Sequence, residues 1–168
     1  MINWQHYPRS VDASNLHKEV IKCFEEVESD IASENHNWQS SRVLEFVRPH
    51  LERIGFNVET GKKAEQKVKV PVLFGLDGKP QKSFEVDAYH EDSRTVLEIE
   101  AGRAVTNYQF LKDFFEACIM HNVDYLVLAI RKIYRKKKDF KKVLTFFETL
   151  YASGRMSIPL KGILIIGY

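Results

Sequence analysis

Apolar residues recur at helical spacing in four segments of the chain, with charged residues between them. In the second segment Gly55 stands where a left-handed C-terminal cap is expected, and Pro49 predicts a kink inside the helix. Asp12 or Ser14 can cap the first helix. The four predicted helices are residues 15–31, the segment that carries Leu44, Val47, Leu51 and Ile54, residues 107–121 and residues 138–151.

Shorter segments alternate apolar and polar residues or are apolar throughout, as strands do. They cover about residues 56–59, 68–74, 83–89, 95–100, 123–130 and 162–167. The strands at 68–74, 83–89 and 95–100 form a predicted antiparallel meander. The near-continuous apolar run at 123–130 predicts a central strand that is covered on both faces. The order α-α-β-β-β-β-α-β-α-β indicates an α/β fold, with three α/β/α layers around a mixed central sheet.

The bulk composition indicates one globular domain over residues 1–168, since 44% of the residues are hydrophobic and 29% are charged. No apolar run reaches the roughly 18 residues that a membrane span needs. The polar N-terminus lacks the apolar segment of a signal peptide. Cys23 and Cys118 lie on apolar helix stripes without a CxxC pair, so we expect buried thiols, no structural zinc and a cytoplasmic protein.

Acidic residues gather in the segment FEVDAYHEDSRTVLEIEAG, which predicts a hairpin with its turn at residues 91–94. Because side chains alternate along a strand, Glu98 and Glu100 share one face. The turn also sets a register that pairs His90 with Thr95, Asp87 with Glu98 and Glu85 with Glu100. We therefore expect up to four carboxylates on one patch of the sheet.

Carboxylates directly opposite one another destabilise a sheet unless they are spread in solvent or neutralised. A solvent-exposed polar face is one interpretation of this patch. The other is a site for a hard cation, because helices should cover the sheet and few lysines or arginines interleave the acids. Two or three carboxylates suit Mg²⁺, with Mn²⁺ as an alternative. Such a metal polarises a phosphoryl oxygen and activates water.

The pattern formed by Val86-Asp87, a short turn, Glu98-Ile99-Glu100, a helix and an apolar strand resembles the PD-(D/E)XK restriction-endonuclease-like superfamily. Because the third position is glutamate and not lysine, the BamHI/BglII-like variant is the nearest in style. The segment from Tyr108 to Phe114 and the strand VDYLVLAIR fit the same layout. The resemblance covers about residues 39–130, and it implies a restriction-endonuclease-like fold.

The resemblance also implies roles for individual residues. Asp87 and Glu98 would be metal ligands, and Glu100 would stand at the lysine position as a base or ligand. Glu45, ahead of Gly55-Phe56, would be an auxiliary acid. Two departures are Val86 in place of the family proline and the absent lysine. Lys112 on the following helix is either a migrated ammonium group or an ordinary solvated lysine.

A dense basic run follows the apolar strand and opens the last helix. Such a run can neutralise phosphates, or it can be a solvated connection. Tyr134 can stack on a base or pack internally, and Lys62, Lys63 and Lys67 can add a second basic rim. Eight of the twelve residues from 131 to 142 are basic: Arg131, Lys132, Arg135, Lys136, Lys137, Lys138, Lys141 and Lys142.

These features predict a Mg²⁺-dependent endonuclease that hydrolyses phosphodiester bonds in DNA through Asp87, Glu98 and Glu100, with Glu45 assisting. Two other hypotheses stay open: a catalytically inactive module that binds nucleic acid or protein on the same fold, and a small-molecule metalloenzyme. No phosphate-cradling glycine motif is present, so we expect no nucleotide cofactor. Tight sequence specificity in so short a chain would require a homodimer or another partner.

Overall fold

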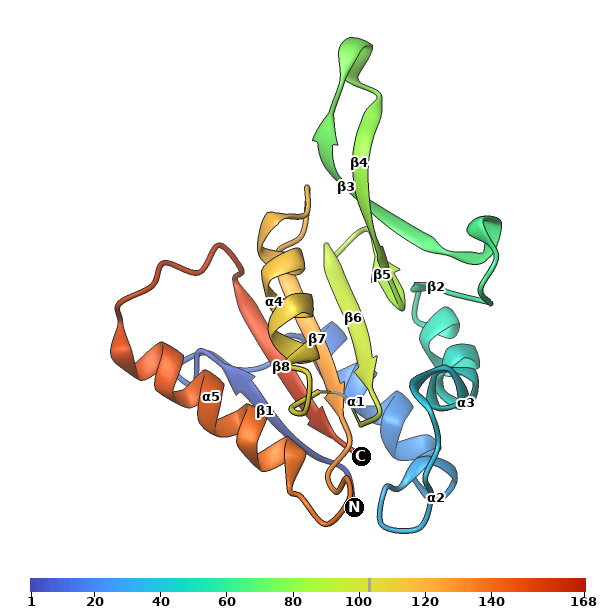
Figure 1. Cartoon of the computed structure of the whole chain (residues 1–168), viewed down its shortest axis with the longest axis vertical. Coiled ribbons are helices and arrows are strands. Elements are labelled where there is room, and N and C mark those ends of the chain that lie inside the picture. Colours follow the sequence, from blue (N-terminus) through green and yellow to red (C-terminus); the bar gives the residue numbers. More distant parts are fainter. Residues whose placement is uncertain (103) are drawn as a thin grey trace.

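A computed structural model describes residues 1–102 and 104–168. Within these residues a six-stranded mixed sheet has the order β1-β8-β7-β6-β5-β2 (Figure 1). Strands β6, β7 and β8 run parallel, and β1, β5 and β2 are antiparallel to their neighbours. The strands are β1 (Asn3–Tyr7), β2 (Asn57–Val58), β5 (Ala88–His90), β6 (Thr95–Glu100), β7 (Tyr125–Ile130) and β8 (Gly162–Gly167).

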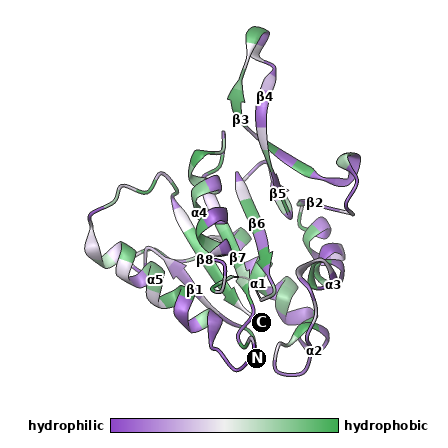
Figure 2. Ribbon diagram, viewed as in Figure 1, coloured by the Kyte–Doolittle hydropathy of each residue, from purple (hydrophilic) through white to green (hydrophobic). Residues whose placement is uncertain are grey.

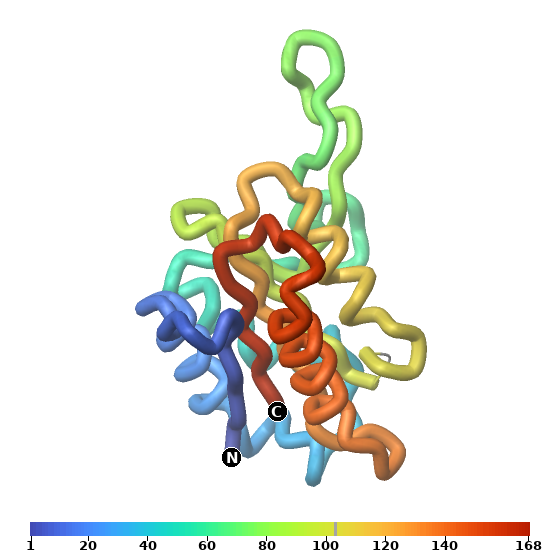
Figure 3. The backbone as a smooth tube through the Cα atoms, turned by 90° about the vertical axis from the view of Figure 1, so that its left-hand side faces the viewer, coloured from blue at the N-terminus to red at the C-terminus, as the bar shows by residue number. Residues whose placement is uncertain are grey.

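Helices cover both faces of this sheet, so the predicted three-layer α/β/α class is confirmed. Figure 3 shows the sheet edge-on, with α1 on one side and α5 on the other. One core joins α1 and α3 to Leu97 and Ile99 of β6, and the other joins α4 and α5 to Val96. The helices are α1 (Asn15–Glu26), α2 (Glu28–Ile31), α3 (Ser40–Arg53), α4 (Gln109–Ile119) and α5 (Asp139–Ser153).

The central strands are buried on both faces, as the apolar run at 123–130 predicts. All six residues of β8 and five of the six in β7 are buried. Along β7, Val127 and Ala129 pack toward α1 and α3, whereas Leu126 and Leu128 pack toward α4 and α5. The same alternation in β6 divides its side chains between the two layers, and it therefore decides where Glu98 and Glu100 point.

Local sequence signals set several helix ends. The Ser14 hydroxyl oxygen accepts a hydrogen bond from the His17 backbone N–H at 3.2 Å, and this caps α1 as expected. Gly55 follows α3 with φ +99°, in the left-handed region that favours glycine. The α3 helix continues through Pro49. The predicted first helix is interrupted at Val27, where α2 begins as a separate short turn.

The predicted meander is wrong in one respect. Strand β3 (Val68–Phe74) pairs with β4 (Pro80–Val86) in a separate two-stranded sheet, and β4 ends before Asp87. The predicted strand at 83–89 is thus two strands that take different partners. Alternation along a segment indicates two faces, but it does not identify the neighbouring strand. The edge strand β1 was not predicted, because its polar sequence NWQHY lacks an apolar stripe.

The β3–β4 hairpin projects from the molecule at the top of Figure 1. Leu73, Phe74 and Leu76 near its tip are exposed, and Figure 2 shows this tip as a hydrophobic segment outside the core. No helix in the described residues is both long enough and apolar enough to cross a membrane.

Candidate functional site

Asp87 lies beside Glu98 as predicted, although Asp87 is not part of the β5–β6 ladder. His90 pairs with Thr95 as expected, and the ladder ends at Ala88 and Leu97. Asp87 follows at the bend between β4 and β5, where its Oδ2 accepts a hydrogen bond from the Ile99 backbone N–H at 2.8 Å. This bond fixes the Asp87 carboxylate beside the Glu98–Glu100 stretch of β6.

Glu85 does not join this group, so its predicted pairing with Glu100 is wrong. In the β3–β4 hairpin Glu85 lies opposite Lys69, and it is exposed. The reason is the bend at Asp87, which turns β4 away from β6 and toward β3. The acidic patch therefore loses one expected member.

Asp113 supplies a carboxylate that the sequence analysis did not identify. Glu98 and Glu100 alternate with Leu97 and Ile99, so they point toward α4, where Asp113 is only 5% exposed. The Gln109 side-chain amide donates to Asp113 Oδ1 at 3.0 Å. Asp113 Oδ2 has no hydrogen-bond partner among the described residues, which is costly for a buried carboxylate.

A sequence signal for Asp113 does exist. Phe110, Phe114 and Ala117 form the buried face of α4, and position 113 lies on the same face. A carboxylate on the apolar stripe of a helix is unusual in a structural position. That placement, and not the spacing of the hairpin acids, points to Asp113.

Burial raises the pKa of all four carboxyl groups, because it disfavours their charged forms. Burial raises the pKa of Asp87 to about 7 and that of Asp113 to about 6. Burial, then the charge of Asp113, raises the pKa of Glu100 to about 9. The pKa of Glu98 also lies well above its usual value, through burial and the neighbouring Asp87.

Two lysines act on this acidic group from its edges. Lys67 is 2.8 Å from Glu59 and 4.0 Å from Glu85, and its charge lowers the pKa of Asp87. Lys112 is 3.3 Å from Glu116 and largely exposed. Its charge lowers the pKa of Glu100. Lys112 therefore lies beside the carboxylates while it pairs with another residue.

The residues present fit a hard divalent cation in their chemistry. All the donors are carboxylate oxygens, which Mg²⁺ and Mn²⁺ prefer, and Asp113 Oδ2 is an orphaned buried acceptor. In the described part of the chain, no three His, Cys, Asp or Glu side chains already surround one point.

The structure does not bring Glu45 into this group. Glu45 is exposed on α3, where Arg42 Nη1 lies 2.6 Å from its Oε2. The physical reason is the layering, since α3 covers the face of β6 that carries Leu97 and Ile99. Glu98 and Glu100 point to the opposite face, so an auxiliary role for Glu45 has no support from this arrangement.

The basic run divides into two internal cations and six exposed ones. Arg131 is 3% exposed and donates to the Ala101 and His36 carbonyls at 3.3 and 2.7 Å. Lys132 lies 3.6 Å from Glu34 and donates to the Met1 carbonyl. The exposed members are Arg135, Lys136, Lys137, Lys138, Lys141 and Lys142. Arg131 thus ties loops together, contrary to its expected place on the phosphate-binding surface.

A tight turn presents part of this exposed group. Tyr134 and Lys137 form an isolated antiparallel bridge, and Arg135 and Lys136 between them have φ values of +47° and +67°. Non-glycine residues rarely adopt this region, so the turn is a strained feature next to a candidate site. The Arg135 guanidinium lies over the Tyr134 ring, 5.2 Å from its centroid.

Tyr134 packs internally, which is one of the two interpretations that its sequence context allows. A Cβ at Gly102 would lie 2.6 Å from Tyr134 Cε2, so glycine lets the ring rest on the connection that follows Glu100. Gly102 also has φ +132°. This contact joins the basic turn to the acidic strand.

We expect Gly102→Ala to destabilise the protein by about 2 to 4 kcal/mol, because it adds a steric clash to an unfavourable backbone conformation. Thermal or urea unfolding measures the change. Gly78→Ala is the matched control, since Gly78 also has positive φ (+69°) but nothing within 4 Å of an added Cβ. Equal losses in the two variants would show that the contact with Tyr134 contributes nothing.

The chain is similar to known proteins in its fold and not detectably in its sequence. No protein-family model matches the chain, and no curated protein matches its sequence. The structure of free BglII, a restriction endonuclease, matches with a TM-score of 0.48 and 8% identity. The match covers 99% of this chain and 78% of BglII.

Proposed function

We propose that this protein is a Mg²⁺-dependent endonuclease that hydrolyses phosphodiester bonds in DNA. The observation that carries the proposal is the gathering of Asp87, Glu98, Glu100 and Asp113 between β6 and α4, with Asp113 Oδ2 unpartnered among the described residues. A buried acidic group of this kind is unstable without a compensating cation. The resemblance of the Asp87…Glu98-x-Glu100 pattern to PD-(D/E)XK nucleases supports the same function.

Each residue has a role that follows from its surroundings. Asp87 and Glu98 would hold the ion, Asp87 being oriented by the Ile99 backbone N–H. A bound divalent cation would polarise the phosphoryl oxygen and make water a stronger nucleophile. Glu100 is held protonated in the metal-free protein by burial and by the charge of Asp113. A bound cation would offset these effects, and Glu100 would then accept the proton of the attacking water. Asp113 would be a further oxygen ligand or would orient Glu100.

The experiment that tests this function is cleavage of supercoiled plasmid by the purified protein, with Mg²⁺ or Mn²⁺ and with EDTA. Wild type should nick the plasmid only with metal, and an Asp87→Asn/Glu98→Gln variant should lose nicking by about 1,000-fold or more, because its remaining donors cannot hold the ion. Cleavage that persists in EDTA, or in the double variant, would overturn the assignment of the site.

The exposed cations around Arg135 and Lys136 are the proposed path of the DNA backbone. Replacing both with alanine should weaken duplex binding and reduce the slope of log affinity against log salt by about 2, near 0.9 for each phosphate that is no longer neutralised. Fluorescence anisotropy over a salt series measures this. Lys18→Ala/Lys22→Ala on α1 is the control, since α1 covers the opposite face of the sheet. The same slope change in both variants would argue against a defined path.

A second function is favoured by one observation. The carboxylates of the described residues do not yet surround a single point, as expected for a catalytically inactive module that binds nucleic acid or protein. Such a module would bind DNA through the same cations without cutting it. Divalent metal would then leave its melting temperature unchanged, whereas the nuclease should be stabilised by metal through Asp87 and its neighbours.

A further inference from the structure

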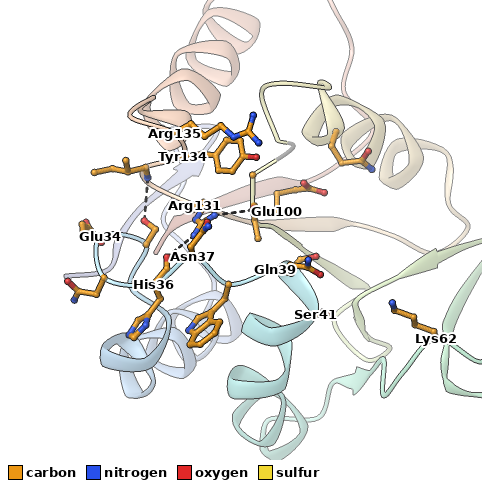
Figure 4. A pocket seen from close by; sticks show the side chains of 18 residues that line it. Glu34, His36, Asn37, Gln39, Ser41, Lys62, Glu100, Arg131, Tyr134 and Arg135 are labelled. Atoms are coloured by element: carbon orange, nitrogen blue, oxygen red, sulfur yellow. Dashed lines mark hydrogen bonds between the residues drawn. The ribbon is translucent and has the colours of Figure 1, made fainter.

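A polar cleft of about 950 Å³ opens beside the carboxylates, and Figure 4 shows the side chains that line it. Its floor is formed by the residues that follow β6 and β7, including Glu100 and Arg131. The loop of residues 33–39 and the start of α3 form one wall, and the turn with Tyr134 and Arg135 forms the other. Clefts of about 300 to 1,000 Å³ suit compact organic ligands.

Hydrogen bonds between distant segments hold the walls of the cleft in place. Arg131 donates to the His36 carbonyl at 2.7 Å, which ties the loop to the end of β7. The Ser33 hydroxyl donates to the Tyr168 carbonyl at 2.6 Å and accepts from the Ile133 N–H at 3.3 Å. The Trp38 indole donates to the Asp30 carbonyl at 2.9 Å. A site fixed in this way loses little conformational entropy when a ligand binds.

The polar groups that reach the cleft are free to bind a ligand. The side-chain amides of Asn35, Asn37 and Gln39 make no hydrogen bond to another described residue, although all three line the cleft. Gln39 is the N-cap residue of α3, yet its side chain forms no capping bond. Lys62 and Arg135 also line the cleft, and neither forms an ion pair within the described residues. Figure 4 shows Asn37, Gln39 and Arg135 around the same opening.

The chemistry of this lining matches an unpaired nucleotide. Asn and Gln amides pair with base edges, free cations neutralise phosphate, and the exposed Trp38 ring offers an aromatic surface for a base. A paired base has its Watson–Crick edge occupied, so amides can pair with that edge only in an unpaired nucleotide. The cleft adjoins the acidic site at two residues. Glu100 lines the cleft directly, and Gln109, which also lines it, donates a hydrogen bond to Asp113.

We propose that this cleft binds unpaired nucleotides of the substrate strand next to the scissile phosphate, so that the substrate is a single-stranded nucleic acid or a duplex with an unpaired segment. The inference rests on the proposed nuclease function, because it places the strand against the same carboxylates. Asn37 and Gln39 read the base, whereas Lys62 and Arg135 hold the backbone on either side.

Binding in EDTA, where no cutting occurs, tests the cleft by itself. Fluorescence anisotropy with a labelled 12-nucleotide single strand and a matched 12-base-pair duplex should show at least tenfold tighter binding of the single strand. Asn37→Ala/Gln39→Ala should remove most of that preference and leave duplex binding unchanged. Gln81→Ala, an exposed amide on the hairpin, is the control and should bind as wild type.

A single strand with three central abasic sites separates base reading from backbone attraction. Wild type should bind it about as weakly as the double variant binds the intact strand. Equal affinity for duplex and single strand, or undiminished binding by the double variant, would overturn the cleft assignment. Those binding results would not bear on the nuclease function, which metal-dependent nicking by wild type tests separately. Conversely, wild type that never nicks but keeps the amide-dependent preference would overturn hydrolysis and not the cleft.

Discussion

Asp113→Asn should reduce metal-dependent cleavage by about 10- to 100-fold and at the same time raise the melting temperature measured in EDTA. The two effects have one cause. Asp113 is a buried carboxylate whose Oδ2 has no partner among the described residues, and its charge raises the pKa of Glu98 and Glu100. Asparagine removes that charge and its repulsion, but it also removes support for the ion, which typically costs 10- to 100-fold.

Asp124→Asn is the matched control for this prediction. Asp124 lies 2.8 Å from Lys161 and 3.7 Å from Arg94, away from the four carboxylates. Its replacement should lower the melting temperature slightly and leave cleavage unchanged. Plasmid nicking and differential scanning calorimetry measure both variants. An Asp113→Asn protein that is both less stable and fully active would show that Asp113 has a structural role only.

Without metal, the protein should become less stable as pH rises from 6.5 to 8.5. Asp87 has a folded-state pKa of about 7 and Glu100 of about 9, both above the values of an unfolded chain. The folded state therefore holds more protons in this window, and stability falls by about 1.4 kcal/mol per pH unit for each extra proton. The expected total is several kcal/mol.

Buried groups outside the acidic site contribute little to stability changes between pH 6.5 and 8.5. The buried His17 has a pKa of about 4, so it affects stability mainly below pH 6.5. Burial raises the pKa of the Cys23 and Cys118 thiols to about 11, and they matter mainly above pH 8.5.

Urea unfolding in EDTA at several pH values measures this effect. A Glu98→Gln/Asp113→Asn variant should show a flatter profile, since it has lost two of the interacting carboxyl groups. Saturating Mg²⁺ should restore stability at pH 8.5, by about 2.7 kcal/mol at a hundredfold excess over Kd. Stability that increases with pH in EDTA would contradict the proton balance assigned to the carboxylates.

The chain by itself determined the layers of the fold and most of the acidic site. Fully apolar runs such as 123–130 can be satisfied only in the middle of a covered sheet, and β7 lies there. The register from His90 and Thr95 followed from a short turn, because local geometry fixes a tight hairpin. The same alternation placed Glu98 and Glu100 on one face, as β6 shows.

Only the tertiary structure decided which partners each segment takes. Alternation in residues 83–89 is equally compatible with either neighbour, and packing assigned β4 to β3 and β5 to β6. Asp113 reached the acidic group because α4 folds over the face of β6 that carries Glu98. Glu45 was separated from it because α3 covers the other face. Sequence periodicity fixes which face of an element is buried, but contacts between distant elements depend on how those faces pack together.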